Sequence, residues 1–147
     1  MGYIMNEEVL KLENQICFPF YALSRVIIRG YQPHLDKLGL TYTQYLVMLV
    51  LWERDDLTVN EIAEKLVLNT NTVTPLLKRM ETVGLLTRIK GEEDERKVFI
   101  RLSEQGASLK EEASCIPQQL LESFGQDEEV LEDLLQMRNT IQRLLHL

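Results

Sequence analysis

Residues 57–106 carry an order of helix and turn signals that few small folds can accommodate. The apolar residues of Val59–Leu66 recur on one face, which predicts a short amphipathic helix. A second amphipathic helix follows after a turn. Because Pro75 has no N–H and is best tolerated in a first helical turn, this second helix is expected to begin near Asn71 or Thr72.

The residues after the second helix predict a hairpin of two strands. Gly84 suits the end of the helix, where a left-handed residue is common. Leu86–Lys90 and Lys97–Leu102 are short and can pair around a charged tip. The residues expected to face the core are Ile89, Val98, Ile100 and Leu102. Helix, turn, helix and hairpin in this order predict a winged helix-turn-helix, which presents one helix to the DNA major groove.

Polar side chains of the second helix and the hairpin are the candidates for DNA contact. Their hydroxyl, amide and cationic groups can bond phosphates and base edges. A charged hairpin tip is often plain solvated surface, but after such a helix we expect Asp94 to aim the Arg96 guanidinium at a narrow minor groove. The predicted DNA-binding residues are Thr70, Asn71, Thr72, Thr74, Pro75, Lys78, Arg79, Arg88, Lys90, Asp94, Arg96 and Lys97.

The net charge of −7 argues at first against a nucleic-acid partner, but the charge is unevenly distributed. Residues 58–101 contain eight basic and seven acidic residues, whereas the rest of the chain contains eight and sixteen. The acidic flanks should keep non-specific DNA binding weak. We therefore expect salt-dependent, sequence-selective binding to double-stranded DNA.

Length and apolar patterning place the chain among globular proteins. Its 147 residues suffice for one compact subunit with a core. The richest apolar run, Tyr45–Trp52, is too short to span a membrane, and Met1–Val9 lacks the features of a signal peptide. We expect a cytoplasmic protein with no membrane partner. With two histidines, two cysteines and no CxxC, no metal or cofactor is predicted.

Helices are predicted on both sides of the winged segment. Leu12–Tyr31 has an apolar stripe, and Gln44–Glu53 is almost entirely apolar. Ser103 is expected to cap a long helix that runs to about Phe124 with a kink at Pro117. A turn at residues 125–126 and a cap at residue 127 should precede a last apolar helix, Glu128–Leu145.

Terminal helices this apolar need a partner surface, and a second copy of the chain is the simplest source. The alternative is that they cover the winged core of a monomer. A two-fold dimer would set two recognition helices about one DNA turn apart and imply a palindromic operator. The predicted class is mainly α (an α+β winged helix), with dimerisation helices in 1–56, the DNA-binding module in 57–102 and dimerisation helices in 103–147.

The runs TPLLKRMETVGLLTR and EEDERKVFIRLSEQG resemble the MarR family of bacterial transcription regulators. The family's D-x-R and L-[ST]-x-x-G signatures are present as Asp94, Arg96, Leu102, Ser103 and Gly106. The resemblance implies a DNA-binding regulator rather than an enzyme, dimerised through its terminal helices. Relatives often enter the recognition helix with acidic-Ser-Gly-Thr, so a different operator is expected where this chain has Asn69, Thr70, Asn71 and Thr72.

Cys17 has two interpretations from the residues alone. A small apolar core residue is the favoured one. However, Pro19 suggests that the regular helix starts near Cys17, and a helix N-terminus favours a thiolate. Nearby phenols could donate hydrogen bonds to that thiolate, and the candidates are Tyr21, Tyr31, Tyr42 and Tyr45.

Three segments, KLENQICFPFYALSR, YQPHLDKLGLTYTQY and LVLWERDDLTV, are similar to the OhrR, MgrA and SarZ branch of the family, which senses organic hydroperoxides. The resemblance implies that Cys17 is the sensing cysteine, that Tyr31 and Tyr42 reach it from the opposite subunit, and that Tyr21 is a further pocket residue. Oxidation to sulfenic acid, or a mixed disulfide with a small thiol, would then release the operator, as in a repressor.

Other interpretations remain beside this one. Cys115 is either a resolving thiol or a bystander, and the bystander is favoured. The regulator could instead be released by a small aromatic or phenolic ligand, in a pocket lined by Tyr21, Tyr31, Tyr42 and Trp52. A thiol peroxidase has no fold signal in its favour, and Arg96 and Lys97 argue against a winged helix that binds only protein.

Overall fold

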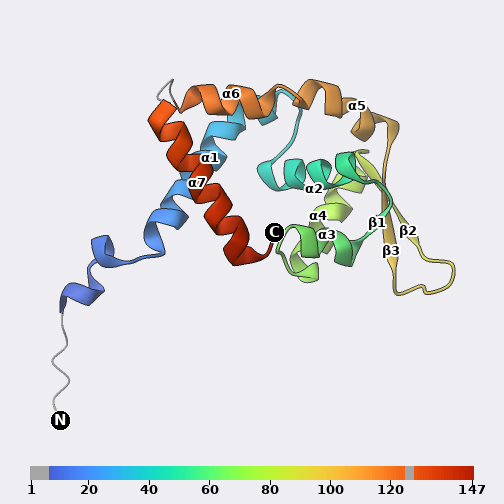
Figure 1. Cartoon of the computed structure of the whole chain (residues 1–147). Helices are drawn as coiled ribbons and strands as arrows, with labels where there is room; N and C mark the ends of the chain where they lie inside the picture. Colours follow the sequence, from blue (N-terminus) through green and yellow to red (C-terminus); the bar gives the residue numbers. More distant parts are fainter. Residues whose placement is uncertain (1–6, 125–127) are drawn as a thin grey trace, which may run out of the picture.

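The winged segment lies at one end of the subunit, and α1, α6 and α7 lie at the other (Figure 1). A computed structural model describes residues 7–124 and 128–147. Within these residues no helix is long and apolar enough to cross a membrane. The elements are the 3-10 turns Glu7–Leu10 and Leu12–Asn14, α1 (Phe18–Asp36), α2 (Tyr42–Glu53), β1 (Leu57–Thr58), α3 (Val59–Lys65), α4 (Thr70–Thr82), β2 (Leu86–Lys90), β3 (Val98–Leu102), α5 (Glu104–Ala113), α6 (Ile116–Ser123) and α7 (Glu128–Leu145).

The hairpin belongs to a three-stranded antiparallel sheet with the order β1-β3-β2. The strand β1 was not expected from the sequence, and it pairs Leu57 with Ile100. Thr58 ends β1 and caps α3, since its hydroxyl accepts from Glu61 N at 3.2 Å while the Glu61 carboxylate accepts from Thr58 N at 2.8 Å. This capping box fixes the first helix of the module against the base of the wing.

The recognition helix α4 begins at Thr70 with Asn69 as its cap, one residue before the expected range. Pro75 therefore lies inside the helix, and its predicted place in the first turn is wrong. The predicted end is confirmed, because Gly84 follows α4 in the left-handed region with φ +83°.

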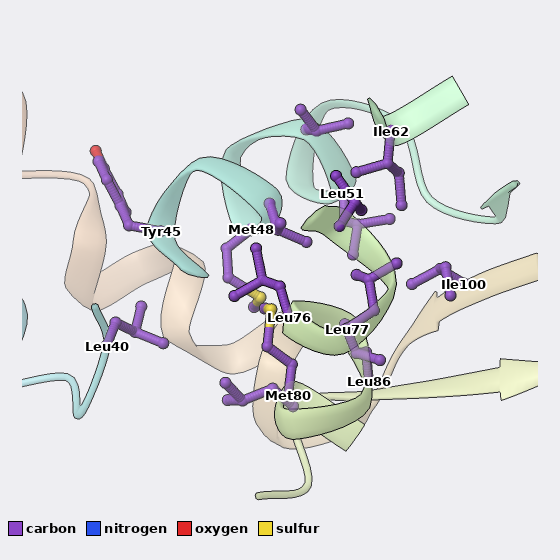
Figure 2. Close-up of a cluster of buried hydrophobic side chains, with 14 of the residues drawn as sticks. Leu40, Tyr45, Met48, Leu51, Ile62, Leu76, Leu77, Met80, Leu86 and Ile100 are labelled. Atoms are coloured by element: carbon purple, nitrogen blue, oxygen red, sulfur yellow. The ribbon is translucent and has the colours of Figure 1, made fainter. Parts of the chain in front are cut away.

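The core lies where α2, α3 and α4 pack against the sheet (Figure 2). Antiparallel partners share a face, so the pairing of Arg88 with Ile100 turns Arg88 inward and Ile89 outward. Ile89 is exposed, which makes its predicted core position wrong. The other three strand predictions are confirmed, with Ile100 fully buried and Val98 and Leu102 packed against the core.

The first helix differs from its predicted bounds at both ends. Residues 12–14 form a 3-10 turn, and α1 begins at Phe18 with Cys17 as its cap, as Pro19 suggested. The helix then continues through Pro33 to Asp36.

The long helix predicted after the wing is two helices. Ser103 does cap α5, through a 3.0 Å bond from Gly106 N, but α5 ends at Ala113. Pro117 lies in the first turn of α6, where its missing N–H costs no helical bond, so the predicted kink is a break. The predicted turn and cap at 125–127 lie outside the described residues. The start of α7 at Glu128 is confirmed.

Candidate DNA interface and redox site

A cleft of about 510 Å³ separates the recognition helix from the wing. The N-terminal ends of α3 and α4 form one side of it, and one side of the hairpin, from β2 to the tip, forms the other. Five of the predicted DNA-binding residues meet there, namely Thr70, Thr74, Arg88, Arg96 and Lys97. Three cations and three threonine hydroxyls surround the opening beside a single carboxylate, that of Glu61. The cations and hydroxyls are the groups that bond phosphate oxygens.

The tip of the wing is held by the predicted pairing of Asp94 with Arg96. The Asp94 carboxylate accepts from Arg96 N and Nε, each at 3.0 Å, and from a terminal guanidinium nitrogen at 3.3 Å. These bonds lower the pKa of Asp94, with the side-chain bond the larger cause. The Arg96 side chain is 91% exposed, so its cation is held in place yet open to solvent.

Two further contacts stabilise the wing, and neither was predicted from the sequence. Gly91 N donates to Lys97 O at 2.8 Å, and a Cβ at Gly91 would lie 2.7 Å from the backbone oxygen of Asp94. At the other end of β3, Arg101 donates to the Asp56 carboxylate at 2.7 and 3.3 Å. Asp56 adopts φ +59°, a conformation that L-residues rarely take, so no periodicity would have indicated this anchor.

Arg88 joins β2 to the recognition helix. Its backbone N–H donates to Glu81 at 2.8 Å, and its guanidinium lies 3.8 Å from the same carboxylate. Among the described residues, Arg88 Nε is buried without a hydrogen-bond partner. A phosphate oxygen entering the cleft could satisfy it.

The remaining predicted DNA-binding residues do not share the cleft. Lys90 lies on the other side of the hairpin, in a hollow that it shares with Asp94. The others lie on the exposed face of α4, opposite its buried residues, and are Asn71, Thr72, Pro75, Lys78 and Arg79.

Cys17 is exposed at the N-terminal cap of α1, so the core interpretation is wrong. Its neighbours are apolar and open, with Ile16 82% and Phe18 39% exposed. Tyr21, one turn further on, is also exposed and accepts a 3.2 Å bond from Arg25, whose guanidinium stacks 5.6 Å from the ring centre.

Tyr31 and Tyr42 do come together, with ring centroids 5.0 Å apart. Tyr45 completes the cluster at 5.7 Å from Tyr31 and 6.5 Å from Tyr42, and Trp52 meets Tyr45 edge-on at 6.3 Å. Burial, together with the two neighbouring phenols, raises the pKa of Tyr31 to about 12. Burial also raises the pKa of Tyr42, so both phenols keep their protons and remain donors at physiological pH.

The cysteine and the tyrosine cluster are far apart within one subunit. Cys17 caps α1, and Tyr31 lies fourteen residues further along the same helix. At the rise of an α-helix this separation is about 20 Å, more than a tyrosine side chain can bridge. Any contact between Cys17 and Tyr31 must come from a second copy of the chain.

Cys115 is exposed at the junction of α5 and α6 rather than on a continuous helix. Its Sγ lies 3.5 Å from Glu112 O. The predicted ligand pocket is only partly reproduced: a hollow of about 310 Å³ includes Trp52, together with Tyr45, but none of the three predicted tyrosines.

Comparisons with known proteins agree with this geometry. The family model described as "Transcriptional regulator SarA/Rot" matches residues 29–113. The organic hydroperoxide resistance transcriptional regulator of Bacillus subtilis is 51% identical over 92% of this chain and 90% of its own length. The regulator SarZ of Staphylococcus saprophyticus is 35% identical over 97% of this chain and 95% of its own.

Solved structures give the same result. AbfR, solved in a reduced form bound to DNA, superposes with a TM-score of 0.73 at 33% identity, covering 96% of this chain and 99% of AbfR. It has also been solved overoxidised on DNA, with a TM-score of 0.68 at 35% identity over 91% and 97% of the two chains. The disulfide form of AbfR matches with a TM-score of 0.64 at 34% identity over 97% and 95%. NadR, solved with 4-hydroxyphenylacetate, matches with a TM-score of 0.67 at 26% identity over 89% and 92%.

Together the cleft, the wing and these relatives define a winged-helix transcription regulator that binds DNA. Within that class, the chain belongs to the MarR-type SarA/Rot family, in the branch that contains the hydroperoxide resistance regulator and SarZ. The resemblance read from the sequence is confirmed.

Proposed function

We propose that this regulator is a dimeric repressor that releases a palindromic operator when an organic hydroperoxide oxidises Cys17. The observation that carries the proposal is the exposed Cys17 thiol at the N-terminal cap of α1. At this position the thiol is open to a small oxidant from solvent. The hydroperoxide resistance named for the Bacillus subtilis relative supports the same signal.

Dimerisation is supported by apolar surface that one subunit leaves open. None of the side chains of α7, all described, is buried, although one face of this helix is apolar. Leu131, Leu135, Leu144 and Leu145 are 37 to 74% exposed. Such a helix is expected to pair with a second copy through residues 103–147, together with the helices of 1–56. The dimer would bring Tyr31 and Tyr42 of one subunit to Cys17 of the other.

The sensing step follows from thiol chemistry. The Cys17 thiolate attacks the distal oxygen of the hydroperoxide, an S–O bond forms, and the O–O bond breaks. The sulfur loses two electrons and becomes sulfenic acid, while the departing alkoxide takes a proton and leaves as an alcohol. The open apolar neighbours Ile16 and Phe18 favour organic over inorganic peroxide.

Release follows from the loss of contacts across the dimer. A small thiol condenses with the sulfenic acid, water leaves, and a mixed disulfide occupies the space beside Tyr31 and Tyr42. The added volume of the mixed disulfide moves the two subunits relative to one another. The recognition helices then lose the spacing that both half-sites require. AbfR binds DNA both reduced and overoxidised, which favours a disulfide over higher sulfur acids as the releasing form.

A second candidate is release by a small aromatic ligand. It is favoured by the hollow of about 310 Å³ beside Trp52 and Tyr45, which both Lys110 and Glu53 also line. NadR was solved with an anionic phenol and supports this alternative.

One experiment separates the two candidates. Operator binding is measured by gel shift with DNA from upstream of the protein's own gene, before and after cumene hydroperoxide and a small thiol. The proteins are wild type, Cys17→Ser and, as a matched thiol control, Cys115→Ser. We expect wild type and Cys115→Ser to be released and Cys17→Ser to stay bound. Equal release of wild type and Cys17→Ser contradicts the proposal, and release by 4-hydroxyphenylacetate alone supports the alternative.

A further inference from the structure

Trp52, the sole tryptophan of the chain, connects the tyrosine cluster to the helix that follows the wing. It lies at the end of α2, and its ring contacts Tyr45 edge-on at 6.3 Å. Its indole N–H donates to Gly106 O in α5 at 2.9 Å, and Lys110 Nζ donates back to Trp52 O at 2.9 Å. Two hydrogen bonds therefore tie the end of α2 to the first turns of α5.

The same turn of α5 is bonded to the end of the recognition helix. Ser103 N donates to Leu85 O at 3.1 Å, and the Ser103 hydroxyl donates to Gly84 O at 2.6 Å. That hydroxyl also accepts from Gly106 N at 3.0 Å. A Cβ at Gly106 would lie 2.0 Å from Leu85 O, so the two backbones are packed as closely as glycine allows.

These contacts form a continuous link between two sites. It runs from Tyr31 and Tyr42 through Tyr45 to Trp52, and from Trp52 through the Ser103–Gly106 turn to the residues that end α4. Aromatic contacts and a turn packed this closely at Gly106 resist gradual deformation, so displacement of the tyrosine cluster is expected to move the α5 turn as a unit.

We propose that Trp52 is a positioning residue, and that its hydrogen bond to Gly106 couples the tyrosine cluster to the orientation of the recognition helix. The inference rests on the proposed function, in which oxidation of Cys17 perturbs Tyr31 and Tyr42. It adds the route by which that perturbation reaches DNA: the indole N–H fixes α5, and α5 fixes the end of α4. The coupling is the ratio of operator Kd in the oxidised state to that in the reduced state.

The test compares wild type with Trp52→Phe, which keeps an aromatic ring beside Tyr45 and removes the donor to Gly106. Ser108→Ala is the matched control, since it removes a 2.8 Å hydrogen bond within α5 that is not part of the link. The operator Kd is measured by fluorescence anisotropy for the reduced protein and again after treatment with cumene hydroperoxide and a small thiol. We expect the ratio of oxidised to reduced Kd in Trp52→Phe to be about fivefold below that of wild type, which is the effect of one hydrogen bond. The Kd of the reduced variant should stay within about twofold of the wild-type value.

Three results overturn the inference. The first is a Kd ratio in Trp52→Phe equal to that of wild type. The second is an equal increase in the operator Kd of the reduced and the oxidised protein, which indicates a merely structural role. The third is an indole emission spectrum of wild type that does not change on oxidation. If Trp52→Phe does not fold, 3-benzothienylalanine at position 52 keeps the ring shape without the N–H, and the same criteria apply.

Failure of the proposed function appears separately from failure of the inference. If wild type and Cys17→Ser respond alike to peroxide, the sensing proposal fails, whatever Trp52→Phe does, and the inference fails with it. If wild type is released, Cys17→Ser is not, and Trp52→Phe is released as fully as wild type, only the inference fails.

Discussion

Replacing Gly106 by alanine tests the close packing of α5 on the end of the recognition helix. The new Cβ would lie 2.0 Å from Leu85 O, about an ångström inside any ordinary contact. The backbone fixes the position of the Cβ, and Leu85 O is itself a backbone atom, so neither atom can rotate away. Relief requires α5 to move and weakens the bonds of Ser103 to Gly84 and Leu85. Overpacking at about 2 kcal/mol and two weakened hydrogen bonds at about 1 kcal/mol each, less about 1 kcal/mol for the better helix propensity of alanine, give a loss of about 3 kcal/mol.

For a chain of this size the loss lowers Tm by about 10 °C. The assay is thermal unfolding by circular dichroism at one protein concentration, because dimerisation makes Tm depend on concentration. Gly30→Ala is the matched control, since its Cβ would meet only the flexible Leu120 Cδ1 at 3.1 Å and alanine suits the interior of α1. If Gly106→Ala melts within about 3 °C of wild type, the packing argument is refuted.

Three other predictions concern the wing and the tyrosine cluster. Arg96→Ala should weaken operator binding at least about tenfold and lower the slope of log K against log salt concentration by about one. Its Tm should be unchanged, because the side chain is 91% exposed. A slope equal to that of wild type would argue against phosphate or minor-groove contact. Gly91→Ala should weaken binding similarly, because its Cβ would lie 2.7 Å from Asp94 O and distort the tip; unchanged affinity in the anisotropy assay would show that the tip does not matter. Tyr31, whose pKa is raised to about 12, should stabilise the fold fully below pH 10, and this stability should be lost between pH 10 and 12 because only the unfolded phenol ionises there. Denaturant unfolding over this range should show a smaller loss in Tyr31→Phe, and an equal loss would contradict the assignment.

The parts of the fold that local signals determine could be read from the sequence. Glycine at 84 ends α4, Ser103 caps α5, and Pro19 marks the start of α1, because each acts on its own few residues. The strand β1 could not be read, since two residues carry no periodicity and pair with β3 far along the chain. Pro117 marked a change in the helix, but the choice between a kink and a break depends on packing around α6.

The site shows the same division between local and tertiary information. The Asp94–Arg96 pair spans two residues and was predictable. The inward turn of Arg88 follows from its pairing with Ile100 in β3, and it reversed the face assigned to Ile89. Tyr45 was considered only as a possible donor to Cys17, although its spacing of three from Tyr42 indicated that the two rings share a helix face; their contact with Tyr31 is tertiary.

The most direct test of the account asks whether Cys17 and the tyrosines act across the dimer. Two differently tagged subunits are co-expressed, and heterodimers are purified. In one heterodimer a single subunit carries Cys17→Ser together with Tyr31→Phe and Tyr42→Phe, which damages both sites if each site is shared between subunits. In the other, one subunit carries Cys17→Ser and its partner carries the two phenylalanines, which damages one site and leaves one intact.

Operator release by cumene hydroperoxide with a small thiol is measured for both heterodimers. The account predicts release of the second heterodimer and little release of the first. The reverse order, in which the first responds and the second does not, would place the cysteine and the phenols in one subunit and contradict the account.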